Sequence, residues 1–253
     1  MSNFTHFSRK RIPLHVRIWI LFVTSLPLLA LAQEKPVEIH NRIINLSSSE
    51  NQIALTLDAC SGKFDQVLID FLIENQIPAT LFLTKRWIIQ NPKGSTLIKN
   101  HLDLFDIENH GEHHIPAVIG VGRRIYGILV EPDLDHLNRE IKVGAEAIED
   151  QFGVKPTWYR GAGAVYDQQS IERITQLDYK IAGFSINADE GATLSAPMIE
   201  KRLKHAQAGD VIIAHMNRPK SGTAQGLKGA LTWLIDKGFV FVRLSEIQVK
   251  RIP

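Results

Sequence analysis

Short apolar runs alternate with amphipathic stretches along most of the chain. Residues 53–58 form an apolar run suited to a strand buried on both faces, and apolar side chains then recur at helical spacing over 67–72. A second strand is predicted at 79–83, a helix at 84–90 and a third strand at 104–108. Strands that alternate with helices in this way predict a parallel sheet built from βα units.

The same alternation continues toward the end of the chain. A long helix is predicted over 134–152, where Gly153 ends it, and Asp167 is a candidate N-cap for a helix that ends at Leu177. The remaining predicted elements are strands at 157–159, 181–186, 211–214 and 239–242 and helices at 196–206 and 226–237. About seven βα units predict an α/β barrel. An open doubly wound sheet is the alternative, but no glycine-rich phosphate fingerprint follows the first strand.

The N-terminal residues 1–32 have the pattern of a signal peptide. A basic segment at 9–17 precedes an apolar run over 18–29, and Ala30-Leu31-Ala32 has the small-x-small form of a cleavage site. The run is shorter than the roughly 20 apolar residues that span a bilayer, so we expect cleavage, with an uncleaved membrane anchor as the alternative. Either case predicts export to the periplasm or the extracellular space.

The composition is that of an ordinary globular protein. The chain has 253 residues, 44% hydrophobic and 22% charged, which is enough for one domain with a large core. We assign 33–51, which is polar and aperiodic, to a linker and 52–253 to one catalytic domain. The net charge of +2, without a basic stripe, argues against a nucleic-acid partner. The single cysteine, Cys60, excludes an intramolecular disulfide and zinc sites that need several thiolates.

Polar side chains follow four of the predicted strands. Asp58 ends the first strand, the segment 109–114 follows the third, Arg160 comes directly after 157–159, and His215 follows 211–214. In parallel α/β folds the carboxyl ends of the strands lie at one face, where catalytic groups gather. We therefore expect these residues to form one constellation.

The residue types in this constellation suit hydrolysis. His110 and His114 are four residues apart, a spacing typical of paired metal ligands if the segment turns helically, although such pairs also occur by chance. Asp58 is costly to bury alone, and Arg160 is its expected partner, either in a structural ion pair or as the group that orients a base. His215 is a candidate general acid, with a satisfied core histidine as the alternative.

The order of these motifs resembles that of the NodB-homology polysaccharide deacetylases, carbohydrate esterase family four. The matching segments are Leu55-Thr56-Leu57-Asp58-Ala59-Cys60, Asn109-His110-Gly111-Glu112-His113-His114, Tyr159-Arg160-Gly161-Ala162-Gly163, 183–189 and 210–215. The resemblance implies a distorted (β/α)7 barrel that removes N-acetyl groups from amino sugars. It implies an N-acetylated glycan as substrate and a divalent metal, with zinc expected, as cofactor.

The resemblance also implies a role for each residue by position. Asp58 corresponds to the catalytic base, Arg160 to the residue that orients it, and His215 to the general acid. His110 and His114 correspond to metal ligands. Each role needs that residue type, because a carboxylate takes a proton from water and an imidazolium protonates the departing amine.

Ala59 departs from the family pattern, which has a second aspartate there as a metal ligand. Three arrangements would repair the site: Asp58 itself binds the metal, Cys60 or His113 enters the shell, or the two motif histidines hold an ion completed by water. We favour the first, which makes Asp58 a metal ligand. The acidic candidates for the base would then be Glu112, Asp189 and Glu190.

Three functions compete on this evidence. The first is metal-assisted hydrolysis of a carbon–nitrogen bond other than a peptide bond, on an N-acetylated glycan. The second is metal-independent hydrolysis of a small amide, which bound stoichiometric metal would argue against. The third is a non-catalytic carbohydrate-binding protein, against which the retained Asp58, Arg160 and His215 argue.

Overall fold

The computed structural model describes residues 1–2, 35–45 and 51–252. The predicted signal peptide therefore lies, except for its first two residues, outside the described residues. Contacts divide the chain into two units, Met1–Gln33 and Glu34–Pro253, and all helices and strands of the described residues belong to the second. No helix in the part of the chain that the structure describes has the length and apolar character needed to cross a bilayer.

One parallel sheet forms the centre of this unit. Among the described residues its strand order is β10-β8-β5-β4-β3-β12-β11, and β13 pairs in parallel with the first residues of β3. The strands are β3 (Asn51–Ala59), β4 (Ala79–Leu83), β5 (Phe105–Asn109), β8 (Trp158–Tyr159), β10 (Lys180–Ile181), β11 (Ile186–Asn187), β12 (Val211–His215) and β13 (Phe239–Val242). The sheet curls, so the predicted distorted barrel is confirmed.

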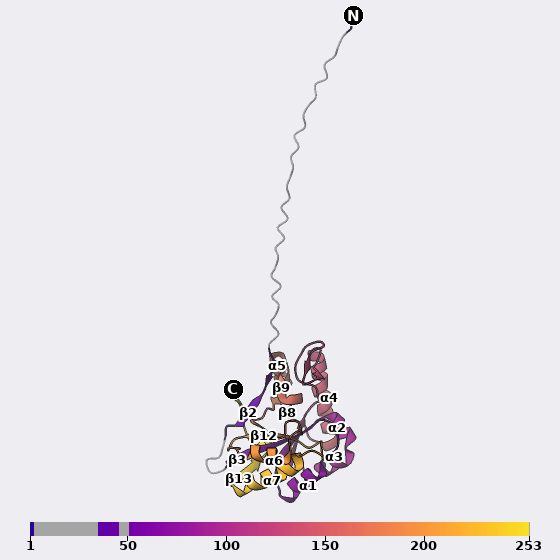
Figure 1. The fold of residues 1–253 in the computed structure, drawn as a ribbon. Helices are drawn as coiled ribbons and strands as arrows, with labels where there is room; N and C mark the ends of the chain where they lie inside the picture. Colours follow the sequence, from indigo (N-terminus) through magenta and orange to yellow (C-terminus); the bar gives the residue numbers. More distant parts are fainter. Residues whose placement is uncertain (3–34, 46–50, 253) are drawn as a thin grey trace. The chain divides into compact units, whose positions relative to one another are not determined.

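Helices alternate with the strands and cover the sheet in two groups (Figure 1). Helices α1, α6 and α7 pack together, and α2, α3, α4 and α5 form the other group of contacts. The helices are α1 (Gln66–Glu74), α2 (Lys85–Gln90), α3 (Pro92–Lys99), α4 (Leu134–Phe152), α5 (Gln168–Gln176), α6 (Ala196–Leu203) and α7 (Thr223–Asp236), with short 3₁₀ turns at Ala162–Ala164 and Leu244–Glu246. All the predicted helices are present, and α3 was not predicted.

The helix ends follow from local chemistry. The Asp167 side chain accepts a hydrogen bond from the Ser170 N–H and caps α5, as its position predicted. The side chains of Thr84 and Asp133 cap α2 and α4 in the same way. Gly153 has a φ of 73°, a left-handed conformation that glycine adopts without a side-chain clash, and it ends α4.

Successive side chains of β3 point to opposite faces of the sheet, so one face holds core residues and the other faces the barrel interior. Leu55, Leu57 and Ala59 are fully buried in the large apolar cluster that the helices cover. Thr56 and Asp58 point the other way, because both contact the Arg160 side chain. The central strand therefore carries its chemistry on one face and its apolar core residues on the other.

Two predictions about elements need correction. The segment assigned to a linker contributes β1 (Val37–Glu38), which pairs with β9 (Val165–Tyr166), and β2 (His40–Ile43), which pairs with β14 (Val249–Ile252). The single strand predicted at 181–186 is interrupted between β10 and β11. The interruption lies where Gly183 packs against the Ile39 carbonyl, so closely that a Cβ there would be 2.2 Å from the oxygen.

Candidate active site

A cavity of about 620 Å³ lies at the carboxyl ends of the central strands. Asp58 and Cys60 enter it from the end of β3, and His215 enters it from the end of the neighbouring strand β12. His114 reaches it from the loop after β5. The structure thus brings together the residues that strand-end reasoning grouped.

Asp58 and Arg160 form a buried ion pair at the base of this cavity. Asp58 Oδ1 accepts a hydrogen bond of 2.7 Å from Arg160 Nη1, and the two side chains are 3% and 0% exposed. Arg160 also donates to Thr56 Oγ1 and to the Gly183 carbonyl, both at 3.0 Å, and lies over the Phe82 ring at 4.1 Å from its centroid. These contacts fix the Arg160 side chain beside the carboxylate, and its role in orienting a base stays a prediction.

The charge state of Asp58 follows from two opposed effects. Burial disfavours the carboxylate, but the positive charge of Arg160, with those of His110 and His215, outweighs burial and lowers the pKa of Asp58 below its usual value. Asp58 Oδ2 lies 3.5 Å from His110 Nε2. An ionised carboxylate at the edge of a cavity can accept a proton from water, which is what a general base requires.

Three side chains with metal-ligating atoms meet beside Asp58. The donor atoms of Cys60, His110 and His114 all lie within 4.8 Å of one another. The two histidine rings meet edge to face at 4.8 Å between centroids. The segment that carries them is a loop after β5, without the helical turn assumed from their spacing, and positive φ angles at Gly111 (88°) and His114 (69°) bend it.

The donor set fits a divalent metal. One thiolate and two imidazoles are ligands that zinc and similar borderline ions favour. Burial opposes ionisation of Cys60, but hydrogen bonds with His110, His114 and His215 outweigh it and hold the pKa of the thiol well below its usual range. Asp58, which we expected to complete the metal site, is not a member of this group, and its ligand role stays a prediction.

His215, which pairs in register with Asp58 on the neighbouring strand, is held by the Asp189 carboxylate. Its Nδ1 lies 2.9 Å from Asp189 Oδ1, and its backbone N–H donates to Asp189 Oδ2 at 2.9 Å. Thr223 Oγ1 donates to the same Oδ2 at 2.9 Å. Burial opposes charge on His215, but hydrogen bonds with Asp189 and Cys60 raise its pKa well above the usual value.

The sequence did not predict this pairing. Asp189 was considered only as an alternative base, yet it is fully buried and both of its oxygens are engaged with His215. The signal that points to it is its place two residues after β11, the strand that pairs with β12. No pattern in the sequence indicated that Thr223 also donates a hydrogen bond to Asp189.

The other alternative residues lie away from the Cys60 group. His113 is half-exposed, and its Nδ1 lies 3.4 Å from Glu112 Oε2 and 3.5 Å from Glu140 Oε2 in a separate cluster. Glu190 lines the cavity but pairs with Arg202. None of these side chains competes with Asp58 for a position beside the histidines.

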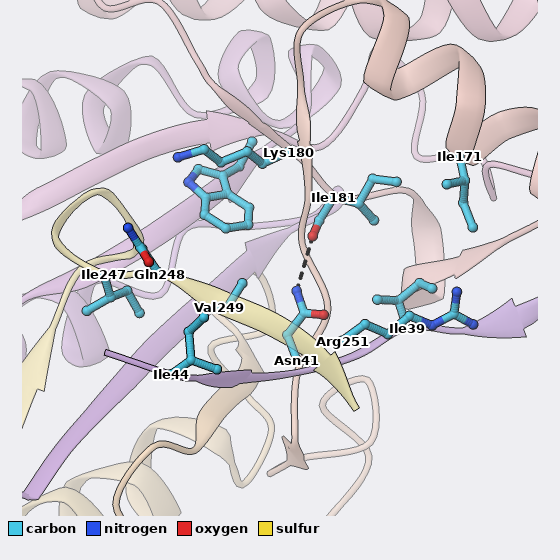
Figure 2. A pocket seen from close by; sticks show the side chains of 11 residues that line it. Ile39, Asn41, Ile44, Ile171, Lys180, Ile181, Ile247, Gln248, Val249 and Arg251 are labelled. Atoms are coloured by element: carbon cyan, nitrogen blue, oxygen red, sulfur yellow. Dashed lines mark hydrogen bonds between the residues drawn. The ribbon is translucent and has the colours of Figure 1, made fainter. Parts of the chain in front are cut away.

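A second cavity of about 450 Å³ contains none of the predicted site residues. Figure 2 shows Ile39, Ile44, Ile181 and Val249 along its walls and a hydrogen bond of 3.1 Å from Asn41 Nδ2 to the Ile181 carbonyl. Its lining is mainly apolar, with Lys180 and Arg251 as the charged members. The chemistry described above is therefore confined to the first cavity.

The fold has counterparts among solved structures. A peptidoglycan N-acetylglucosamine deacetylase superposes with a TM-score of 0.66 at 21% identity, covering 79% of this chain and 89% of that one. A CE4 family pseudoenzyme from Bacillus anthracis superposes with a TM-score of 0.63 at 16% identity, covering 79% and 66%. At these identities the likeness concerns the fold.

The sequence has curated relatives as well. The peptidoglycan N-acetylglucosamine deacetylase PgdA of Listeria monocytogenes is 25% identical over 207 residues, which are 81% of this chain and 41% of that protein. The chain spans about half or less of the length of the curated relatives it matches first. The model of the family described as polysaccharide deacetylase matches residues 45–182, more than half of the chain. This chain belongs to the polysaccharide deacetylase family.

Proposed function

We propose that this protein is an exported, metal-assisted N-deacetylase of an amino-sugar polysaccharide. The main support for the proposal is that one cavity contains two oriented groups, a carboxylate and an imidazole, at the ends of neighbouring strands. Asp58 is fixed by Arg160, and His215 is fixed by Asp189. Membership of the polysaccharide deacetylase family and the likeness to peptidoglycan deacetylases support an acetylated glycan as substrate.

The reaction follows from the two charge states. Asp58 is ionised and takes a proton from the attacking water, while His215 is protonated and delivers its proton to the departing amine. Arg160 keeps the carboxylate in place, and Asp189 keeps the imidazole Nδ1–H directed away from the cavity so that Nε2 faces it. A divalent metal held by His110 and His114, with zinc expected, would polarise the amide carbonyl.

Export is part of the proposal and rests on the sequence alone. The pattern of residues 1–32 supports delivery to the periplasm or the extracellular space, where polysaccharides are accessible. An uncleaved segment would instead anchor the domain at the membrane. Comparing the N-terminus of the secreted protein with that of the full chain distinguishes the two.

Acetate release from N-acetylated glycans tests the catalytic assignment. We expect peptidoglycan fragments or N-acetylglucosamine oligomers to lose acetyl groups in the presence of the wild type. Asp58→Asn and His215→Gln are each expected to slow release by about 10²–10⁴-fold, the usual contribution of a positioned acid or base. His113→Gln is the matched control, because His113 is exposed and lies outside the cavity group.

The outcomes separate the competing functions. Unchanged rates in Asp58→Asn or His215→Gln would remove that residue from the mechanism. Acetate release from small amides but not from glycans would favour the small-amide hydrolase. Glycan binding without acetate release from any substrate would favour a non-catalytic binding protein.

A further inference from the structure

The alternation of side chains along β3 determines which positions face the cavity. Ala59 lies with Leu55 and Leu57 in the apolar cluster on the helix side of the strand. Asp58 lies on the interior side, so the period of two makes Cys60 the next residue on that side. The Cys60 side chain does line the cavity, and its Sγ lies 3.6 Å from His110 Nε2. Position 60, rather than position 59, presents a side chain to the two histidines.

The hydrogen bonds of His110 leave one nitrogen available as a ligand. Its Nδ1 lies 2.6 Å from the backbone carbonyl of Arg160. A carbonyl oxygen can only accept, so Nδ1 carries the proton and donates it. When the second ring proton leaves, the lone pair is on Nε2, which lies 3.6 Å from Cys60 Sγ and 3.5 Å from Asp58 Oδ2. Metal-binding histidines are oriented by such a bond from the second nitrogen to a carbonyl.

Asp58 is held by Arg160 through Oδ1, while its Oδ2 lies 3.5 Å from His110 Nε2. One of its oxygens accepts the short hydrogen bond from Arg160, and the carboxylate lies outside the set of donor atoms within 4.8 Å of one another. The neighbours that the structure gives the Cys60 thiol are three cavity histidines, the two motif residues His110 and His114 and the candidate acid His215.

From this geometry we infer that Cys60 is the third protein ligand of the metal, with His110 and His114. The inference rests on the metal-assisted function proposed above and gives that site a sulfur donor, where the family pattern has an aspartate one residue earlier. Asp58 is then left free to act as the base. A site with one thiolate and two imidazoles takes Zn²⁺ or Co²⁺ and disfavours the hard ions Mg²⁺ and Ca²⁺.

The absorption spectrum of the Co²⁺-loaded protein tests directly whether Cys60 is a metal ligand. Because Cys60 is the only cysteine in the chain, a thiolate-to-cobalt charge-transfer band in the near ultraviolet can arise from this residue alone. We expect the Co²⁺-loaded wild type to show the band and Cys60→Ser to lose it. Zinc affinity should fall at least about 100-fold in Cys60→Ser, more than the loss of an outer partner usually causes. Asp58→Asn is the matched control and should keep both the band and the affinity.

Alkylation tests the same ligand in the unmodified protein, should Cys60→Ser fail to fold. Zinc is expected to slow iodoacetamide labelling of Cys60 at least about tenfold in the wild type, because a metal-bound thiolate is less reactive than a free thiolate. The protection should disappear in His114→Ala. A wild type that binds cobalt without the band, or labelling that zinc does not slow, would overturn the inference.

Two results distinguish this inference from the proposed function. A cobalt–thiolate band in a protein that releases no acetate would sustain the metal site and contradict deacetylation. Acetate release that is abolished by Asp58→Asn but accompanied by an acetyl thioester trapped on Cys60 would contradict the metal role, because that thiol would then be the nucleophile.

Discussion

Buried charge is the feature that sets the chemistry of individual residues in this protein. The side chains of Asp58, Arg160 and Asp189 are each at most 3% exposed, and each has an oppositely charged partner. Unpaired charges at such positions would be strongly disfavoured. The same contacts that make burial tolerable also fix the position of the base and of the acid, so stability and catalysis depend on the same hydrogen bonds.

Replacing Arg160 tests that link. Arg160→Met leaves Asp58 buried without its partner and should lower the free energy of unfolding by about 3–5 kcal/mol. Adding Asp58→Asn removes the stranded charge and should restore part of the loss. Urea denaturation of the two single variants and the double variant measures the coupling. Strictly additive losses would show that the pair does not act as a unit.

Glu108 predicts a pH dependence of stability that is separate from the cavity. Burial raises the pKa of Glu108 from 4.5 to about 7, although the N–H groups of Thr157 and Trp158 donate to it. The folded state therefore binds the proton more tightly, and the stabilisation present below the unfolded pKa is lost as pH rises through the folded pKa. This loss amounts to about 3 kcal/mol at about 1.4 kcal/mol per pKa unit.

Glu108→Gln should remove this dependence, because glutamine keeps an oxygen acceptor but does not ionise. Unfolding free energies at about pH 4.5 and about pH 8 are to be compared with the wild type and with Glu74→Gln, a control at an exposed position. Glu131 also has a pKa raised by burial to about 7. Because it is present in all three proteins, its contribution cancels when their pH dependences are compared. An identical pH slope in Glu108→Gln and the wild type would refute the assignment.

At the scale of elements, the loop that carries the histidines is held by α4. Asn109 Nδ2 donates to the Ile141 carbonyl at 2.8 Å, and the Glu140 carboxylate accepts from the His113 N–H at 2.9 Å. Gly144 allows the close approach, since a Cβ there would lie 2.5 Å from Asn109 Oδ1 and 2.7 Å from the Gly111 carbonyl carbon. The position of the histidines therefore depends on glycine at position 144, because any side chain there would displace the loop from α4.

Gly144→Ala should push the loop away from α4. We expect a loss of about 1–3 kcal/mol in unfolding free energy from overpacking, together with weaker zinc binding. Glu146→Ala is the matched control, because it removes only an exposed pair with Lys142 on the same helix. Denaturation and zinc titration of both variants check the prediction. Equal zinc affinities in the two would show that the loop does not rely on α4.

The strand-and-helix pattern could be predicted where the elements are long enough to show a period. The buried strands β3, β4 and β12 and the long helix α4 carry unambiguous patterns. Strands β1 and β2 have only two and four residues and lie in a polar segment, so no period is visible there. Their existence depends on partners more than a hundred residues away in the chain.

The site could be predicted to the same partial extent. The grouping of Asp58, Arg160 and His215 could be predicted, because each lies at the end of a predicted strand and parallel strands end at one face of the sheet. The candidate metal ligands could not be assigned, because choosing between Asp58 and Cys60 requires knowing how far the donor atoms of each lie from both motif histidines. The partnership of His215 with Asp189 required the pairing of β11 with β12, which involves two residues on each strand.

At the scale of the whole molecule, distant parts of the chain converge on one cavity. Its lining includes Glu38 near the start of the described domain, Tyr126 from the hairpin of β6 (Arg124–Ile125) and β7 (Ile128–Leu129), and Arg218 after β12. These groups surround the Asp58 and His215 pair with polar and aromatic side chains.

The central claim is that this cavity hydrolyses the amide of an acetylated glycan with the help of a bound metal. The measurement that tests it most directly is acetate release from N-acetylglucosamine oligomers before metal removal, after chelation, and after zinc or cobalt is restored. A metal-assisted reaction predicts acetate release that is lost on chelation and recovered when the metal is restored. Release that is indifferent to chelation, or absent in all three states, would contradict it.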